Sequence, residues 1–158
     1  MIILDTKKDY KNHINLLKSK GEIISLVPTM GNLHDGHLSL VEIAKKNSSK
    51  VITTIFVNPL QFGKNEDFAS YPRTMNQDIS KLKKLNCDIL FAPKTKNEVF
   101  NNINNLKSLK AGPKGNILCG KIRPGHFDGV LKVIYMFFQL TQPNLSVFGL
   151  KDFQQLYL

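Results

Sequence analysis

The clearest structural signal in this sequence is the run Ile23-Ile24-Ser25-Leu26-Val27, which ends at Pro28. The run is nearly continuous in its apolar character and is too short to be a typical helix. Such a pattern is typical of a strand that is buried on both faces, as strands are in parallel sheets. The run therefore predicts a buried strand that stops at Pro28.

Helical and strand patterns alternate on either side of this run. Periodic or short continuous apolar patterns predict helices at residues 8–18, 40–47, 74–85 and 127–140, and strands at 51–57, 88–91 and 145–148. A last helix is predicted to start at Lys151, whereas residues 94–121 fit no single pattern. This alternation favours an α/β fold with a doubly wound, Rossmann-like parallel sheet. At 158 residues, we expect one domain over residues 1–158.

The composition is that of a soluble globular protein, with 42% hydrophobic and 22% charged residues. The N-terminal apolar stretch is too short for a signal peptide, and no uncharged apolar run reaches the ~20 residues that span a bilayer. Cys87 and Cys119 are isolated, which favours neither a disulfide framework nor a zinc knuckle. We therefore expect a cytoplasmic protein that makes no use of a membrane.

The net charge of +10 leaves two classes of partner open. Clustered Lys and Arg bind nucleic acid by releasing its counterions, but the lysine pairs here fall in three separate predicted helices. A positive field equally favours small polyanions such as ATP or a carboxylate. This scatter favours small-molecule substrates and no nucleic acid, although charge alone does not separate the two.

Three loops follow the predicted strands, at residues 28–37, 58–61 and 149–155. In doubly wound folds, ligands bind in the crevice at the carboxyl ends of the strands. We therefore expect these three loops to line one crevice.

The first loop carries His34-Asp35-Gly36-His37 at the expected entry to a helix. Asp35 is a candidate N-cap, Gly36 permits close approach of a ligand, and the two histidines share one face. Two imidazoles beside free helix N–H groups make an anion site suited to a triphosphate. Two ordinary surface histidines are the alternative, and a zinc site lacks further ligands at suitable spacing.

The other two loops carry polar groups that suit the same crevice. Lys151 and Asp152 follow Gly149 at a helix start, where an ammonium group can meet phosphate oxygens. Gln61 and Gln155 offer amides that donate to a carboxylate and accept from a hydroxyl. An isolated glutamine is usually just solvated, so only their predicted shared location favours a binding role.

Two further motifs are weaker. Gly115 to Lys121 has the spacing of a phosphate loop, but Ile122 replaces the magnesium-binding Ser or Thr and no strong strand precedes it. We interpret that match as chance. Arg123-Pro124-Gly125-His126-Phe127 fits either a loop that presents two cationic groups or a helix start whose Pro sets the turn.

Residues 27–37, Val-Pro-Thr-Met-Gly-Asn-Leu-His-Asp-Gly-His, resemble the nucleotide-binding signature of the pantothenate synthetase family. More segments resemble the same family in the same order: Phe56-Val57-Asn58-Pro59-Leu60-Gln61-Phe62, Tyr71-Pro72-Arg73-Thr74, Arg123 to Phe127, and Lys151-Asp152-Phe153-Gln154-Gln155. Related nucleotidyltransferases share only the HxGH element. The resemblance implies the fold of the HIGH-motif nucleotidyltransferases and extends through nearly the whole chain.

The resemblance implies an ATP-dependent ligase that condenses pantoate with beta-alanine through a pantoyl adenylate, with release of pyrophosphate and AMP. By the same resemblance, Mg²⁺ accompanies ATP as a substrate, no cofactor is tightly bound, the protein itself holds no metal, and the chain forms a homodimer. Two segments are implied to bind ATP: Met30, Gly31, Asn32, Leu33, His34, Asp35, Gly36 and His37 in the first, and Gly149, Leu150, Lys151 and Asp152 in the second.

The resemblance also implies individual roles. His37 is the expected proton donor, and His34 and Lys151 are further catalytic candidates. Gln61 and Gln155 are expected to bind pantoate, and Gln61 also beta-alanine. Supporting roles fall to Asn58, Tyr71 and Arg123.

Two features depart from the family pattern. Leu150 stands where the family commonly has Glu, and the family continues beyond Leu158 with a smaller C-terminal domain that this chain lacks. In the family that domain closes over ATP, so we expect this chain to bind substrates with little turnover. Another HxGH nucleotidyltransferase and a basic nucleic-acid-binding module remain the alternatives.

Overall fold

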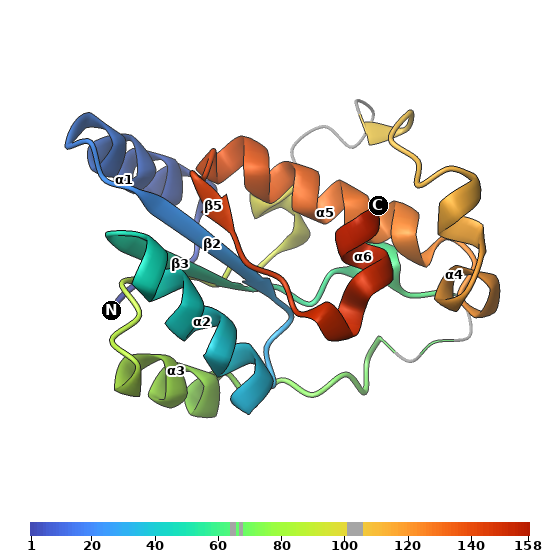
Figure 1. Ribbon diagram of the computed structural model, residues 1–158, viewed down its shortest axis with the longest axis horizontal. Helices are drawn as coiled ribbons and strands as arrows, with labels where there is room; N and C mark the ends of the chain where they lie inside the picture. The colour runs from blue at the N-terminus through green and yellow to red at the C-terminus, as the bar shows by residue number, and fades with distance from the viewer. Residues whose placement is uncertain (64–65, 67, 101–105) are drawn as a thin grey trace.

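The structure is a computed structural model that describes residues 1–63, 66, 68–100 and 106–158 (Figure 1). Its main elements are β1 (Ile2–Leu4), α1 (Lys7–Ser19), β2 (Ile24–Thr29), α2 (Asp35–Asn47), β3 (Lys50–Ile55), η1 (Pro59–Gln61), α3 (Met75–Lys84), β4 (Ile89–Phe91), η2 (Lys96–Glu98), η4 (Pro113–Asn116), α4 (Cys119–Ile122), α5 (His126–Thr141), β5 (Leu145–Ser146), η5 (Leu150–Asp152) and α6 (Phe153–Tyr157). Each helix and strand predicted from the sequence has a counterpart among them.

The strands form one parallel sheet in the order β1-β4-β3-β2-β5. From β2 the chain steps through β3 to β4 in one direction and later returns to place β5 on the other side of β2. The order therefore reverses between β2 and β5, and ligands of doubly wound sheets bind at such a point. The α/β prediction is confirmed.

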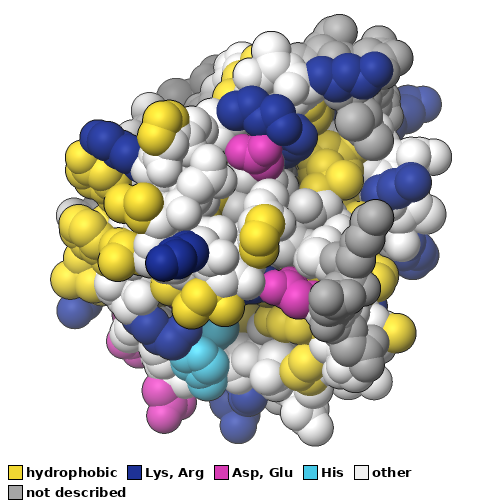
Figure 2. Space-filling model, turned by 90° about the vertical axis from the view of Figure 1, so that its right-hand side faces the viewer, with side chains coloured by type: hydrophobic (Ala, Val, Ile, Leu, Met, Phe, Trp, Pro, Cys, Tyr) yellow, Lys and Arg dark blue, Asp and Glu magenta, His cyan; other side chains and the backbone are white. Residues whose placement is uncertain are grey.

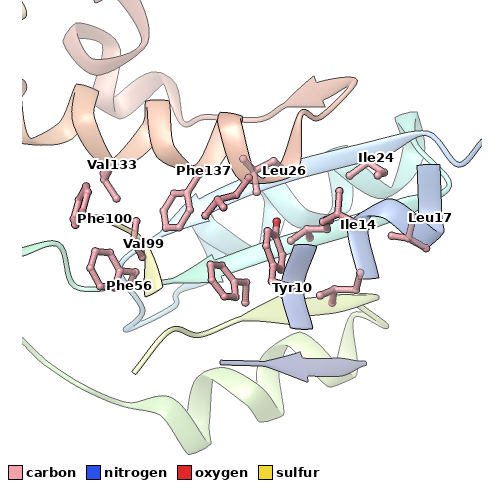
Figure 3. Packing of buried hydrophobic residues seen from close by; sticks show 14 of the residues in the cluster. Tyr10, Ile14, Leu17, Ile24, Leu26, Phe56, Val99, Phe100, Val133 and Phe137 are labelled. Atoms are coloured by element: carbon pink, nitrogen blue, oxygen red, sulfur yellow. The ribbon is translucent and has the colours of Figure 1, made fainter. Parts of the chain in front are cut away.

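Helices cover both faces of the sheet, as Figure 1 shows. On one face α1 and α5 pack over a core that includes Tyr10, Leu26 and Phe137, the residues seen together in Figure 3. On the other face α2 and α3 contribute Val41 and Leu82 to a second core. The central strands are thus buried on both sides, which explains their continuous apolar character.

The prediction that the first strand ends at Pro28 is wrong by one residue. Pro28 lies inside β2, opposite Thr54 of β3, and the strand continues to Thr29. The missing proline N–H is tolerated because the even-numbered residues of β2 bond toward β5, as when the Val147 N–H donates to the Leu26 carbonyl at 3.0 Å, and β5 ends at Ser146, before it reaches a position opposite Pro28. The strand β1 was not predicted, because its three residues owe their pairing to β4 and not to a local pattern.

Residues 113–122 form two short helical turns that pack backbone to backbone. A Cβ atom on Gly120 would lie 1.8 Å from the carbonyl oxygen of Gly115, so glycine at position 120 allows α4 to pack closely against η4. No strand occurs in the described residues 106–114. These facts agree with the interpretation of Gly115 to Lys121 as a chance match to a phosphate loop.

Among the helices of the described residues, none is long and apolar enough to cross a membrane.

Candidate active site

The loop between β2 and α2 turns sharply at two residues with positive φ. Gly31 has φ 82° and Asn32 has φ 50°, a region that glycine adopts freely and asparagine tolerates. A Cβ atom on Gly31 would also lie 3.0 Å from the Ile55 side chain and 3.1 Å from the Asp78 carboxylate. The turn therefore brings the backbone of this loop tightly against β3 and α3.

The Asp78 carboxylate of α3 anchors this loop from beneath. It accepts the backbone N–H of Leu33 at 2.8 Å and of Asn32 at 3.0 Å, and the Thr74 hydroxyl at 3.0 Å. Asp78 as a whole is only 1% exposed. Because a buried carboxylate is stable only with such donors, the contacts both satisfy Asp78 and hold the loop.

Sequence reasoning missed Asp78. The available signal was its place four residues before Leu82, on the face of the predicted helix 74–85 that turns inward. An acidic residue on an apolar face requires a partner, but the sequence does not show which backbone groups supply it.

The His34 side chain, and not Asp35 as predicted, caps helix α2. Its Nδ1 accepts the Gly36 N–H at 3.1 Å, and His37 Nδ1 accepts the His34 N–H at 3.4 Å, a reciprocal capping box. Asp35 is instead the first residue of the helix, because the backbone of His34 is extended (φ −132°, ψ 176°) and the helical conformation begins only after it. A Cβ atom on Gly36 would lie 2.9 Å from the His34 ring, so glycine makes room for this cap.

The capping contacts determine which ring nitrogens are free. A neutral imidazole whose Nδ1 accepts a hydrogen bond carries its proton on Nε2. His34 and His37, whose ring centroids lie 4.1 Å apart, thus each have an Nε2–H group left to donate to a ligand. Burial lowers the pKa of His37, and the neighbouring His34 lowers it further. His37 therefore favours its neutral, donating form near neutral pH.

The three predicted loops line one cavity of about 380 Å³ at the carboxyl ends of β2 and β5, which confirms that they converge. Its lining residues are Pro28, Met30, Gly31, Asn32, His34, Gly36, His37, Leu40, Gln61, Tyr71, His126, Phe148, Gly149, Lys151, Asp152 and Gln155. Three of the predicted ATP-binding residues do not line it. Leu33 is buried in the core, Asp35 is exposed on α2, and Leu150 is 77% exposed.

A smaller cavity of about 120 Å³ lies beside the first and shares His37, Gln61 and Gln155 with it. Apolar side chains of α5 form part of its wall, among them Val130, Val133, Ile134 and Phe137. It thus combines an apolar wall with two amides and an imidazole, a lining suited to a small, branched, polar molecule.

The two glutamines differ in how firmly they are held. Gln61 is 8% exposed, its Nε2 donates to the Met30 sulfur at 3.0 Å, and its Oε1 accepts from Asn58 at 3.0 Å. The amide of Gln155 has no hydrogen-bond partner within the described ranges. Its neighbour Gln154 secures α6 by donating to the carbonyl of Ile117 at 2.8 Å, among other contacts. Gln155 is therefore placed by its helix yet free to meet a ligand.

Lys151 has the most exposed charge of the site. Its side chain is 85% exposed and its ammonium lies 3.5 Å from the Asp152 carboxylate. An exposed ion pair of that length contributes little to the stability of the fold and does not hold the ammonium firmly. The ammonium is therefore available to a phosphate at the mouth of the larger cavity.

A third cavity, of about 580 Å³, lies on the other side of Met30 and Gly31, at the ends of β3 and β4. Its cations are largely engaged within the protein: Arg73 donates to three backbone carbonyls and Lys94 pairs with Asp5. It contains neither the histidine pair nor the glutamines. We therefore assign no substrate to it.

Positive side chains are spread over the face shown in Figure 2, among hydrophobic and uncharged groups, and form no single stripe there. Within the described residues, no group of three or more His, Cys, Asp or Glu side chains is placed to hold a metal ion.

Comparison with known proteins gives the family of this chain. A model of the family described as pantoate-beta-alanine ligase matches residues 2–158. A pantothenate synthetase of Psychrobacter cryohalolentis is 53% identical over 84% of this chain and 46% of its own length. The pantothenate synthetase of Chromohalobacter salexigens is 44% identical over 98% of this chain and 55% of its own length.

Solved structures agree with this result. The pantothenate synthetase from Thermus thermophilus matches with a TM-score of 0.89 and 39% identity, over 99% of this chain and 54% of that chain. The pantoate-beta-alanine ligase from Francisella tularensis, complexed with beta-gamma ATP and beta-alanine, matches with a TM-score of 0.91 and 43% identity, over 99% of this chain and 59% of that chain. This chain spans about half the length of the relatives it matches. With its whole described fold and nearly its whole sequence matched, the chain belongs to the pantoate-beta-alanine ligase family, whose members are the pantothenate synthetases.

Proposed function

We propose that the protein to which this chain belongs is an ATP-dependent ligase that joins pantoate to beta-alanine. The observation that carries this proposal is the meeting of Gln61 and Gln155 with His37 in one small cavity beside the larger, cationic one. The first step transfers AMP: a carboxylate oxygen of pantoate attacks the α-phosphorus of ATP, and pyrophosphate leaves. In the second step the amine of beta-alanine attacks the acyl carbon, and AMP leaves with the formation of pantothenate.

The cavity of about 380 Å³ that contains the histidine pair, called the larger cavity here and below, suits ATP. The N-terminus of α2 presents the partial positive charge of the helix dipole, and His34 and His37 add two Nε2–H donors. Lys151 lines the same cavity, and its ammonium is held only by a 3.5 Å contact with Asp152, so it can also meet phosphate oxygens. Together these groups can stabilise the charge that develops on the phosphates as pyrophosphate departs. His37 is proposed as the donor nearest the reacting phosphate, because it lines both cavities.

Mg²⁺ is proposed to arrive with ATP. Hard divalent cations of this size bind through phosphate oxygens and one or two carboxylates, and Asp152 is a carboxylate that lines the cavity. The ion supplies charge neutralisation for the phosphates.

The smaller cavity suits pantoate. The amides of Gln61 and Gln155 can donate to its carboxylate and accept from its hydroxyl groups. The apolar wall of α5 can receive its two methyl groups, since Val130 and Val133 line the cavity. Gln61 is also proposed to contact beta-alanine, in line with the beta-alanine complex of the Francisella tularensis relative. A cytoplasmic homodimer is proposed for the whole protein on family membership.

The test of this function is pantoate-dependent exchange of pyrophosphate into ATP, with this chain extended to the full length of its relatives. We expect exchange with pantoate and none with phosphopantetheine, whereas the opposite preference would indicate a nucleotidyltransferase of another specificity. Replacing His37 by Ala is expected to slow exchange by a factor that corresponds to about 2.7–4 kcal/mol, as for other donors to a developing oxyanion. An unchanged rate would contradict the role of His37.

A further inference from the structure

The turn that carries Gln61 is held by the first two turns of α5. The His126 Nδ1 atom lies 2.8 Å from the backbone carbonyl oxygen of Gln61. The Asn58 amide donates both to the Gly129 carbonyl at 3.0 Å and to the Gln61 side-chain oxygen at 3.0 Å. Backbone and side chain of Gln61 are therefore both oriented from α5, one directly and the other through Asn58.

Gly129 makes this arrangement possible. A Cβ atom at this position would lie 2.0 Å from the Leu60 carbonyl oxygen and 2.6 Å from the Gln61 Cα atom. These are backbone atoms that no side-chain rotation can move. Helix α5 and η1 thus approach too closely for any side chain at position 129, and the position of Gln61 depends directly on α5.

The direction of the His126 contact follows from its other neighbour. The His126 Nε2 atom lies 3.1 Å from an Arg123 guanidinium nitrogen, which can only donate. Nε2 therefore accepts, and Nδ1 carries the proton and donates to Gln61. Arg123 is itself held by the Glu66 carboxylate, at 2.6 Å through Nε and at 2.8 Å through a terminal nitrogen. A chain of contacts thus runs from Glu66 through Arg123 and His126 to Gln61.

Both ring nitrogens of His126 are used within the protein, although the ring borders the larger cavity. No nitrogen is left to bind a substrate while these contacts hold. Burial lowers the pKa of His126, and Arg123 opposes protonation as well, while Gln61, Glu66 and Asp152 favour it. The ring is thus suited to remain neutral. A neutral ring is required here, because Nε2 can accept from Arg123 only when it carries no proton.

We infer that His126 is a positioning residue for pantoate: by donating to the Gln61 carbonyl it sets the place from which the Gln61 amide meets the substrate. The inference rests on the proposed function, in which Gln61 binds pantoate. It assigns His126 no contact with ATP. Loss of the Nδ1 donor is therefore expected to weaken pantoate binding selectively.

The test compares three variants of this chain by calorimetric titration with ATP and with pantoate. His126→Ala removes the donor, whereas His126→Asn replaces it, because the Asn Nδ2 group can occupy the place of the His Nδ1–H. Gln139→Ala, an exposed residue of the same helix for which no side-chain contact is described, is the control. Thermal unfolding of each variant checks that the fold is retained.

We expect His126→Ala to raise the dissociation constant for pantoate about tenfold, as the loss of one buried hydrogen bond would, with the ATP constant within about twofold of wild type. For His126→Asn, both dissociation constants are expected to stay within about threefold of wild type. For the control Gln139→Ala, both are expected to equal those of wild type. Equal weakening of ATP and pantoate binding, or an Asn variant as weak as the Ala variant, would overturn the positioning role alone. Wild type that binds ATP but not pantoate would overturn the proposed function, and this inference with it.

Discussion

The carboxylate of Asp78 accepts the backbone N–H of Leu33 at 2.8 Å, across 45 residues of sequence. This contact joins helix α3 to the loop that carries the histidine pair, and the Asn32 N–H adds a second bond at 3.0 Å. Both N–H groups are engaged by Asp78 and are therefore not free to meet a ligand. The turn between β2 and α2 is thus shaped by a buried residue that lies beneath it.

Replacing Asp78 by Ala leaves two backbone N–H groups and the Thr74 hydroxyl without this acceptor. Since unsatisfied buried groups cost about 1–3 kcal/mol each, we expect the free energy of unfolding to fall by about 3 kcal/mol, measured by urea denaturation. ATP affinity is expected to fall as well. Glu42→Gln, an exposed change on α2, is the matched control and is expected to alter neither quantity. An Asp78→Ala variant of wild-type stability would contradict the anchoring role.

His34 has two roles that substitution can separate. His34→Ala removes the N-cap of α2 and is expected to lower the free energy of unfolding by about 1 kcal/mol and to weaken ATP binding. His34→Asn retains a good cap but loses the imidazole Nε2–H donor. We expect this variant to unfold like wild type in urea while still binding ATP more weakly in calorimetry. Wild-type ATP affinity in the Asn variant would show that His34 serves the helix alone.

The histidines of the site are expected to differ in tautomer. The contacts of His34 and His37 place the proton of each neutral ring on Nε2, whereas those of His126 place it on Nδ1. Nitrogen-15 NMR of labelled imidazoles distinguishes the two forms above the pKa of each ring. A proton on Nδ1 of His37 would contradict the capping box, and a proton on Nε2 of His126 would contradict its hydrogen bond to Gln61.

The Glu66 to Arg123 pair predicts a dependence of stability on pH. The hydrogen bond that Arg123 donates to the Glu66 carboxylate lowers the pKa of Glu66 from its ordinary value of 4.5 to about 2. The folded state therefore binds this proton less readily than the unfolded state, so the stabilisation is complete above pH 4.5 and is lost as the pH falls toward 2. In thermal unfolding between about pH 6 and pH 2, Glu66→Gln is expected to show a smaller loss of stability than wild type. An equal loss of thermal stability in wild type and in Glu66→Gln would contradict a stabilising contact between Glu66 and Arg123.

Much of the fold was predictable because its signals are local. The apolar run at residues 23–27 and its alternation with helical patterns indicated a parallel sheet, and the loops after the strands then had to share one edge. The site residues His37, Gln61 and Gln155 came together for that reason. The identity of the expected substrates came only from the resemblance to the family, because no single loop specifies a substrate.

The parts that were not predictable depend on long-range contacts. Strand β1 exists through its pairing with β4, and β2 passes through Pro28 because the nitrogen of Pro28 faces the side of β5, which ends before it reaches Pro28. Asp78 and His126 act on backbone groups far away in sequence, and such partners leave no periodic trace. The preference for His34 over Asp35 as N-cap depends on ring geometry that residue propensities do not describe.

The most direct test of the central claim, that one crevice of this chain binds ATP and pantoate side by side, is calorimetric titration of pantoate into the chain saturated with ATP. Gln155 lines both cavities and lacks a hydrogen-bond partner among the described residues, so Gln155→Ala removes the proposed contact with pantoate and should have little effect on the fold. The account predicts one pantoate site per chain in wild type and a loss of affinity of about tenfold or more in Gln155→Ala, with ATP binding retained. Equal pantoate affinity in the two proteins, or no binding of ATP by the wild-type chain, would contradict it.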